Sequence, residues 1–177
     1  MRRLFLAVPL PRQIKKRLAL EVEELRKLLP DWTIKWVDPE NLHITLVFFG
    51  WVKEEQIETL QAEIRTAVPE SLPFDIATGK LSRKGRPLWL EIESGRNELQ
   101  ALAETLSKKL TLKGSLKEER EFHPHLTLGR IKKRGRKNLP KTDQSFGWRA
   151  DRLVLYESKF VRKQRIYEEV FSFPLGE

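Results

Sequence analysis

The tetrapeptide His-x-Thr-Leu occurs twice in this chain of 177 residues, at residues 43–46 and 125–128. The two copies use two of the three histidines that are present. Both lie in strand-like runs, residues 42–49 and 125–131, in which positions i and i+2 share a face. Each histidine, His43 or His125, therefore stands beside a threonine, Thr45 or Thr127. The repetition predicts paired histidine chemistry at one shared site.

The composition indicates which partners the chain can bind and in which cellular compartment we expect it. The net charge is +9, which favours an anionic partner such as nucleic acid. The chain has no cysteine, which excludes disulfides and thiolate metal sites. It shows neither a secretory segment nor an apolar run near the length of a membrane span, so we expect a cytoplasmic protein without membrane contact. With 40% hydrophobic residues it can bury a real core, and we expect a monomer in which residues 1–177 form one two-lobed catalytic domain.

The periodicity of apolar residues predicts a mixed succession of strands and helices. Helical spacing predicts helices over residues 12–28, 54–68 and 97–112. Alternation and short apolar runs predict strands over residues 3–8, 33–37, 42–49, 74–81, 88–92, 125–131, 150–158 and 166–173. We expect an α/β fold of the α+β kind, in which two pseudo-symmetric lobes carry antiparallel-rich sheets that line a central cleft, with the helices outside. Each half of the chain contributes one His-x-Thr-Leu strand, as a diverged duplication would.

Two imidazoles suit a reaction that needs an acid and a base at neutral pH. The displacement at a phosphodiester is such a reaction, and a cyclic phosphate fits the pair best. The hydroxyls of Thr45 and Thr127 would hydrogen-bond the phosphoryl oxygens, and Arg130 would add a bidentate charge. Arg130 lies at an odd offset from His125, so it reaches the site only if Gly129 permits a bend or a bulge.

Three segments together resemble a known family, the two-histidine phosphoesterases, and within it the RNA 2',3'-cyclic phosphodiesterase branch, also called 2'-5' RNA ligase-like. The segments are residues 3–7 (RLFLA), residues 41–46 (NLHITL) followed by Phe49 and Gly50, and residues 123–130 (HPHLTLGR). The resemblance implies an enzyme without metal or cofactor that opens the 2',3'-cyclic phosphate at RNA ends, tRNA fragments among them, to a 2'-phosphate. It implies His43 as the acid and His125 as the base, with Thr45, Thr127 and Arg130 at the phosphate.

Other functions stay open alongside this one. A 2'-5' RNA ligase would have to work without a nucleotide, because residues 141–144 (KTDQ) lack the glycine of the Lys-x-Asp-Gly motif and no Walker-type loop exists. A non-catalytic RNA-binding module would need only the positive charge. His123 is interpreted as a structural residue, although His43, His123 and His125 together could form a three-histidine zinc site.

Basic and aromatic residues offer further contacts to RNA. The basic run of residues 132–137 leaves the second motif strand directly, so it would rim the cleft and contact the RNA backbone. The basic run of residues 83–86 is interpreted as a solvated loop. The five tryptophans are interpreted mainly as packing residues, although one of them could stack on the terminal base.

Overall fold

The computed structural model describes residues 1–177 except 69–71, 111–121, 143, 163 and 177. Nine strands and three α-helices occur in the described part of the chain. The strands are β1 (Arg2–Pro9), β2 (Thr33–Trp36), β3 (His43–Val52), β4 (Phe74–Arg83), β5 (Pro87–Ser94), β6 (His125–Lys133), β7 (Gly147–Ala150), β8 (Arg152–Val161) and β9 (Gln164–Pro174). The helices are α1 (Arg12–Leu28), α2 (Ile57–Ala67) and α3 (Arg96–Lys109).

The strands form two antiparallel sheets, as predicted. Sheet A has four strands in the order β3-β1-β8-β9, and sheet B has five in the order β2-β6-β5-β4-β7. The first motif therefore lies on β3, at an edge of sheet A, and the second lies on β6, inside sheet B. The elements β3 and β6 contact one another, which brings the two motif strands together.

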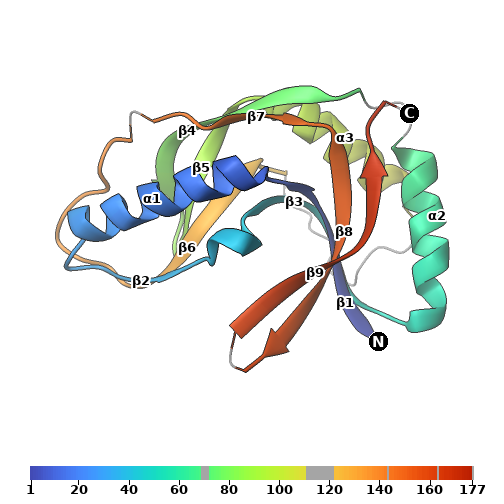
Figure 1. Cartoon of the computed structure of the whole chain (residues 1–177), viewed down its shortest axis with the longest axis horizontal. Coiled ribbons are helices and arrows are strands. Elements are labelled where there is room, and N and C mark those ends of the chain that lie inside the picture. The colour runs from blue at the N-terminus through green and yellow to red at the C-terminus, as the bar shows by residue number, and fades with distance from the viewer. Residues whose placement is uncertain (69–71, 111–121, 143, 163, 177) are drawn as a thin grey trace.

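The helices cover the sheets because each buries one apolar face. Helix α1 lies across sheet B in Figure 1, with Ile14, Leu18, Val22 and Leu25 buried. The guanidinium of Arg26 stacks over Trp36 of β2 at 5.5 Å, which ties the end of α1 to this sheet. Helix α3 contacts β3, and α2 contacts both α3 and β9. Buried side chains from all three helices and both sheets form one hydrophobic cluster.

The sequence halves exchange strands, which the duplication argument did not predict. Strand β2 from the first half pairs with β6 of the second, and β8 from the second half pairs with β1 of the first. The hairpin of β8 and β9 thus completes sheet A (Figure 1). Neither sheet is built from one half of the chain alone.

Several predicted boundaries differ from the structure in detail. Strand β3 does not end at Gly50 but continues to Val52, with Gly50 at a φ of +71°, where a residue without a Cβ is favoured. The predicted helix over residues 54–68 begins as a 3₁₀ turn at Glu54–Gln56. Strand β7 was missed, because four residues give too short an alternation. The predicted last turn of the third helix, residues 111 and 112, lies outside the described residues.

The search for membrane-spanning segments found none: no described helix combines the length and the apolar character that a bilayer crossing requires.

Candidate active site

His43 is the first residue of β3, and both of its ring nitrogens are engaged. Its Nδ1 lies 2.7 Å from the carbonyl oxygen of Asn41. A carbonyl only accepts, so Nδ1 carries the proton in the neutral ring. Nε2 lies 2.9 Å from Oγ1 of Thr45 and accepts the hydroxyl proton in that state. The predicted pairing of each histidine with its i+2 threonine is thus a direct hydrogen bond in the first motif.

His125 repeats the same backbone contact in the second motif. Its Nδ1 lies 2.7 Å from the carbonyl oxygen of His123, again two residues earlier. The neutral ring therefore carries its proton on Nδ1, and Nε2 keeps its lone pair. His125 and Thr127 are both partly buried on β6. Within the described residues, neither Nε2 of His125 nor the hydroxyl of Thr127 has a hydrogen-bond partner, so both are open to a ligand.

The environment of His43 lowers its pKa to about 4. Burial is the main cause, because it disfavours the charged ring, while the hydrogen bond to Asn41 acts in the opposite direction. The positive charges of Lys15 and His125 lower the pKa further. His125 therefore lies close enough for its charge to act on His43, which joins the two motifs in one electrostatic environment. At neutral pH the ring of His43 is uncharged.

Aromatic rings lie against both imidazoles, two of them at His43 and one at His125. The ring of Phe5 lies 4.8 Å from that of His43, and Tyr167 meets His43 edge-on at 5.1 Å. These rings come from β1, which pairs with the motif strand β3, and from β9, which forms the opposite edge of sheet A. Trp89 of β5 lies 5.5 Å from His125. Phe5 and Tyr167 contribute to the burial of His43 that lowers its pKa.

A β-bulge follows the threonine in each motif. Between β5 and β6, Trp89 pairs with Thr127 and Leu88 pairs with Gly129, which leaves Leu128 as the extra residue. Between β1 and β3, Thr45 pairs with Ala7 and Val47 pairs with Leu6, which leaves Leu46 as the extra residue. The two motifs therefore share the same backbone irregularity at the same position. A bulge of this kind shifts the alternation of faces by one residue.

The bulge explains how Arg130, at an odd offset from His125, can lie on the same face of β6 as the motif residues. Leu126, Leu128 and Ile131 are buried, whereas His125 and Thr127 are partly exposed and Arg130 is exposed. Arg130 therefore shares the less buried face of β6 with the motif residues, despite its odd offset. The bend that the sequence argument required is present. Beside the bulge, Gly129 lets β2 approach β6 closely, since a Cβ there would meet Cγ2 of Ile34 at 2.8 Å and the carbonyl of Lys35 at 3.1 Å.

The three-histidine zinc alternative finds no support in the geometry. No group of three or more His, Asp or Glu side chains that could hold a metal ion occurs in the described ranges, which include His43, His123 and His125. His123 contributes its backbone carbonyl to His125. That contact comes from the backbone, so the structural role predicted for the His123 side chain stays a prediction.

Two features of the site escaped the sequence argument. Lys15 of α1 donates from Nζ to the carbonyl of Glu40 at 2.7 Å, which brings a cation beside the first motif. Asn41 donates from Nδ2 to the carbonyl of Arg165 at 2.7 Å, which ties the turn before His43 to β9. Both contacts join segments far apart in the chain, so no local pattern could have indicated them.

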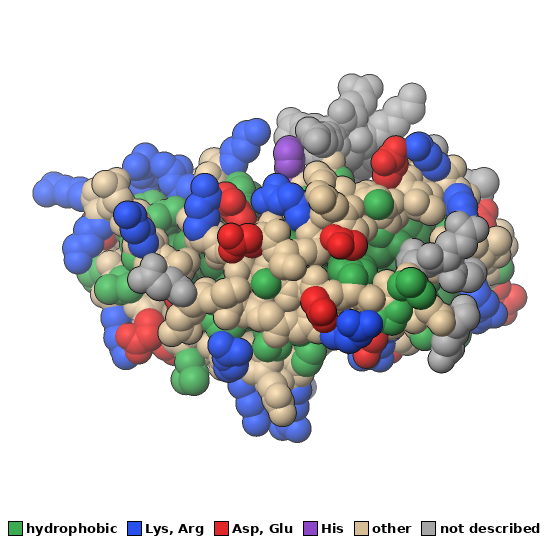
Figure 2. Space-filling model, turned by 90° about the horizontal axis from the view of Figure 1, so that it is seen from above, with side chains coloured by type: hydrophobic (Ala, Val, Ile, Leu, Met, Phe, Trp, Pro, Cys, Tyr) green, Lys and Arg blue, Asp and Glu red, His purple; other side chains and the backbone are tan. Residues whose placement is uncertain are grey.

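The basic loop, residues 132–137, is fixed at its far end. Asp31 accepts hydrogen bonds from the backbone N–H groups of Arg136 and Lys137, and the bond from Arg136 holds the pKa of Asp31 below its ordinary value. Trp32 donates from Nε1 to the carbonyl of Lys137 at 3.2 Å. The five basic side chains of the loop are exposed, and Figure 2 shows Lys and Arg side chains gathered at the end of the molecule where this loop lies.

Comparison with known proteins extends the likeness to the whole chain. A family profile described as the 2'-5' RNA ligase superfamily matches residues 11–159. A protein of Bacillus subtilis named RNA 2',3'-cyclic phosphodiesterase is 32% identical, over 97% of this chain and 96% of the relative. A protein of Methanocaldococcus jannaschii with the same name is 34% identical, over 95% of this chain and 98% of the relative.

Solved structures agree with the profile. The crystal structure of Escherichia coli LigT complexed with 3'-AMP superposes with a TM-score of 0.86 at 25% identity, and the alignment covers 99% of both chains. The alignment thus includes both sheets and both His-x-Thr-Leu strands. Profile, relatives and structure converge, and the chain belongs to the 2'-5' RNA ligase superfamily.

Proposed function

We propose that this protein is an RNA 2',3'-cyclic phosphodiesterase, which hydrolyses a terminal 2',3'-cyclic phosphate to a 2'-phosphate. The observation that carries the proposal is the matched pair of imidazoles. In each, a backbone carbonyl two residues earlier fixes the proton on Nδ1, which leaves Nε2 for proton transfer. The proposal is supported by the relatives from Bacillus subtilis and Methanocaldococcus jannaschii that carry this name over nearly their whole length.

The two histidines would divide the proton transfers between them. Nε2 of His125 takes a proton from water as the water oxygen bonds to phosphorus. The bond between phosphorus and the 3' oxygen breaks, and His43 gives its proton to that oxygen. The assignment of His43 as acid and His125 as base follows the family resemblance.

Because the pKa of His43 is low, the ring must first gain a proton before it can act as the acid. A ring with a pKa of about 4 is neutral in the free protein at pH 7. It acts as an acid only if the bound phosphate, a negative charge beside the ring, raises that pKa. Binding of the substrate would then favour protonation of His43. The ring would later give this proton to the 3' oxygen of the substrate.

The remaining polar groups would hold the phosphate. Once Nε2 of His43 is protonated it no longer accepts from Thr45, so that hydroxyl becomes free to donate to a phosphoryl oxygen. Thr127 and Arg130 share the less buried face of β6 with His125. A guanidinium supplies a bidentate contact to two phosphoryl oxygens and balances charge that develops in the transition state.

The deciding experiment is the incubation of purified protein with an oligoribonucleotide that ends in a 2',3'-cyclic phosphate, in the presence of a chelator. We expect a product that has gained one water and whose phosphate is a 2'-monoester, identified by mass spectrometry and phosphorus NMR. A 3'-phosphate product would show that the 2' oxygen leaves instead of the 3' oxygen. Activity that needs added zinc or manganese would refute the metal-free mechanism.

The same assay separates the alternatives. The superfamily description includes 2'-5' ligation, so a second RNA with a free 5' hydroxyl belongs in the reaction. A joined product without added nucleotide would indicate a reversible ligase. Binding without any product would indicate an RNA-binding module.

A further inference from the structure

Lys15 lies on the flank of the buried face of α1. It precedes the buried Leu18 by three residues, a spacing that places two side chains on the same side of a helix. Its side chain is only 17% exposed, so the protein covers most of the aliphatic stem. An ammonium held this closely against the protein needs partners there.

The partners of the Lys15 ammonium belong to the short 3₁₀ turn η1 (Pro39–Asn41), which precedes the first motif. Nζ donates to the carbonyl of Glu40 at 2.7 Å and lies 3.5 Å from the carboxylate of the same residue. The side chain of Glu40 is 79% exposed, so its carboxylate reaches into solvent and the carbonyl is the stronger contact. The backbone of the turn therefore sets the position of the ammonium.

The next carbonyl of the same turn holds His43. Nδ1 of His43 lies 2.7 Å from the carbonyl oxygen of Asn41, one residue after the carbonyl that holds Lys15. Nδ2 of Asn41 donates to the carbonyl of Arg165, which ties the other side of the turn to β9. One short turn thus places a lysine cation and the first motif imidazole on neighbouring peptide groups.

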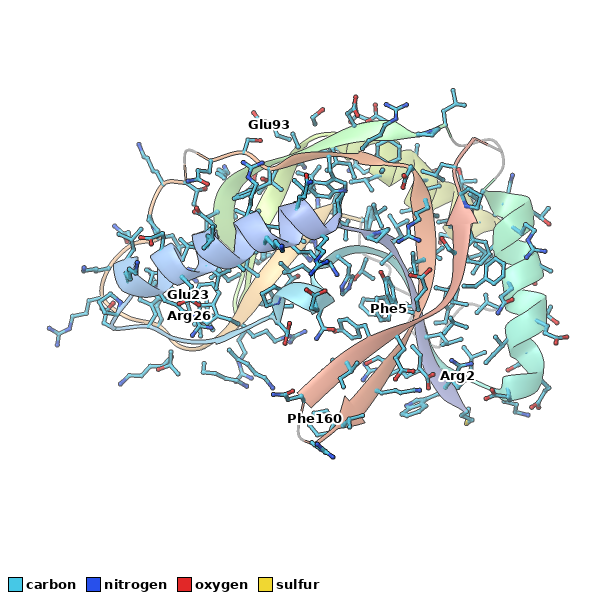
Figure 3. All side chains as sticks on the ribbon, viewed as in Figure 1. Arg2, Phe5, Glu23, Arg26, Glu93 and Phe160 are labelled. Carbon is cyan, nitrogen blue, oxygen red and sulfur yellow. The ribbon has the colours of Figure 1, made fainter. Side chains whose placement is uncertain are left out.

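Other ion pairs of α1 stay on the surface of the helix. Arg26 pairs with Glu23, and Lys27 pairs with Glu24, in each case three residues away; Figure 3 labels the first pair, near the end of the helix. All four side chains are at least half exposed, and surface pairs of this kind contribute little. Lys15 instead reaches the backbone of the turn before the motif.

Lys15 supplies a charge near His43 that persists at every pH of interest. Burial is the main cause of the low pKa of His43, and the positive charge of Lys15 lowers this pKa more than that of His125 does. The rings of Tyr167 and Tyr156 lie 5.1 and 6.2 Å from His43, but phenols are uncharged at neutral pH. An imidazole gains or loses its charge in this range, whereas a lysine keeps it.

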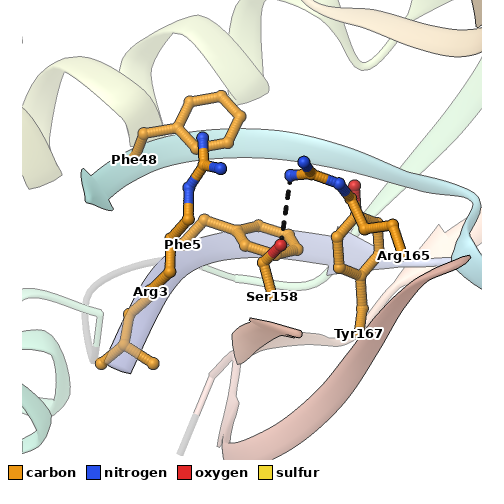
Figure 4. Close-up of a pocket in the computed structure, with 7 residues that line it drawn as sticks. Arg3, Phe5, Phe48, Ser158, Arg165 and Tyr167 are labelled. Carbon is orange, nitrogen blue, oxygen red and sulfur yellow. Dashed lines mark hydrogen bonds between the residues drawn. The ribbon is translucent and has the colours of Figure 1, made fainter. Parts of the chain in front are cut away.

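Two arginines near the site are screened by solvent. Arg3 and Arg165 line a shallow pocket together with Phe5, whose ring packs on His43 (Figure 4). Both arginines are exposed, and Arg165 donates to Oγ of Ser158 at 3.3 Å. Water and salt weaken the field of exposed charges, and they weaken that of a covered ammonium less. Lys15 is therefore the better placed cation to act on the ring.

We propose that Lys15 is a positioning residue for proton transfer: held by the turn before the first motif, its fixed charge makes proton uptake by His43 depend on an anion in the site. This inference rests on the proposed function and deepens it. A cyclic phosphate carries one negative charge, which offsets the charge of Lys15 when it binds beside the ring. His43 then takes a proton from solvent in the complex and stays neutral in the empty site.

Variants of Lys15 test the effect of its charge. Lys15→Met keeps the aliphatic stem and removes the charge, whereas Lys15→Arg keeps the charge. Lys16→Met is the matched control, because Lys16 is the next residue of the same helix and is exposed. One readout is the NMR titration of the His43 ring, with and without inorganic phosphate. The other is the pH profile of kcat/KM for adenosine 2',3'-cyclic phosphate.

The pKa of His43 in the phosphate-free protein should rise in Lys15→Met, because a nearby positive charge is gone. At pH 5 the protonated fraction of the ring should increase by about twofold or more, and added phosphate should raise it by a smaller factor than in the parent. The acidic limb of the kcat/KM profile should move to higher pH, since this profile reports the free protein. Lys15→Arg and Lys16→Met should follow the parent.

A purely structural role for Lys15 predicts a shift of the opposite sign. If Lys15 only supported the turn, its loss would weaken the hydrogen bond between Asn41 and His43, and this bond raises the pKa of His43. An unchanged or lower pKa of His43 in Lys15→Met would therefore overturn the inference. Lys15→Gln, which keeps a polar end and loses the charge, decides by the same criterion if Lys15→Met does not fold.

The failure of this inference is distinct from the failure of the proposed function. The NMR titration needs no turnover, so it decides the role of Lys15 even if the protein hydrolyses no cyclic phosphate. If the parent hydrolyses the substrate and the pKa of His43 is the same in parent and Lys15→Met, the role of Lys15 is overturned and the phosphodiesterase stands.

Discussion

The hydroxyl oxygen of Thr45 lies 2.9 Å from Nε2 of His43, while the opposite nitrogen of the same ring faces the carbonyl of Asn41 at 2.7 Å. The two contacts fix the ring in one orientation and one neutral tautomer. The low pKa of His43 keeps it in that form at neutral pH. The resting site therefore holds a neutral imidazole, and the acid role that we propose for His43 requires the substrate to charge this ring first.

Replacement of either motif histidine by alanine should lower turnover of a cyclic-phosphate RNA by about 10² or more, the usual worth of a positioned acid or base. Steady-state kinetics measures the loss, and circular dichroism checks that the fold is intact. His123→Gln is the matched control, because that residue acts through its backbone carbonyl. Near-parental activity in His43→Ala or His125→Ala would refute two-histidine catalysis.

Thr45→Val removes the hydroxyl and keeps the size and the β-branched shape of the side chain. The His43 ring then loses the partner of its Nε2, and the phosphate loses one donor, so we expect kcat to fall by about tenfold. Thr45→Ser keeps the hydroxyl and should retain most of the activity. Equal activity of the valine and serine variants would remove this hydroxyl from the mechanism.

Folding stability should depend on pH through His43. The unfolded chain binds a proton on this ring near pH 6.5 and the folded protein only near pH 4, so the unfolded state binds more protons between these values. The free energy of unfolding should therefore fall as the pH drops, by about 2 kcal/mol between pH 7 and pH 5 from this ring alone. Urea denaturation at both values measures the loss.

The comparison with His43→Ala assigns that loss to the ring. The variant should lose about 2 kcal/mol less than the parent between the two pH values. NMR titration completes the test: phosphate or a 2'-nucleotide should raise the pKa of His43. If the ligand instead charges His125 and leaves His43 neutral at pH 6, the acid and base roles are reversed.

Gly129→Ala should destabilise the protein and impair catalysis together. The new Cβ would lie 2.8 Å from Cγ2 of Ile34, so β2 has to move away from β6 at the bulge that orients Arg130. We expect a loss of about 1–3 kcal/mol in the free energy of unfolding, and a lower kcat at temperatures where the variant is folded. Gly147→Ala is the matched control in the same sheet, because its Cβ would meet only the carbonyl of Ile76, at 3.6 Å.

Charge reversal in the basic loop should act on long substrates only. Lys132→Glu together with Lys133→Glu should weaken a long cyclic-phosphate RNA at low salt and reduce its salt dependence, because fewer counterions are released on binding. The mononucleotide cyclic phosphate should be hydrolysed as by the parent. A measurement of KM over a range of salt concentrations, with both substrates, tests this, and equal salt dependence for both would remove the loop from the path of the RNA.

The sequence was informative where a local pattern determines structure. The alternation of residues 42–49 and 125–131 predicted both motif strands, and the 3.6-residue spacing of leucines and isoleucines predicted all three helices. The bulge at Leu128 was anticipated because Arg130 needed it. The matching bulge at Leu46 was not predicted, because no residue expected at the site lies at an odd offset from His43.

Contacts between segments far apart in the chain could not be predicted from the sequence. The pKa of His43 depends on Lys15 of α1, and its packing depends on Phe5 of β1 and Tyr167 of β9. Only Phe5 follows from the pairing of β1 with β3. Lys15 lies on a helix and Tyr167 on the opposite edge of sheet A, so both reach His43 through the packing of segments far apart in the chain. Spacing along the sequence carries no information about such pairings.

The exchange of strands between the halves has a consequence for how the protein is made. Strand β1 leaves the ribosome well before its partner β8 is synthesised, with Leu4 opposite Glu157. Before β8 is synthesised, β1 can pair only with β3. The edge of β1 that β8 later covers is unpaired during this time and can pair with another nascent chain. The aromatic surround of His43 includes Tyr167, so the first histidine acquires its final environment only after β9 has left the ribosome.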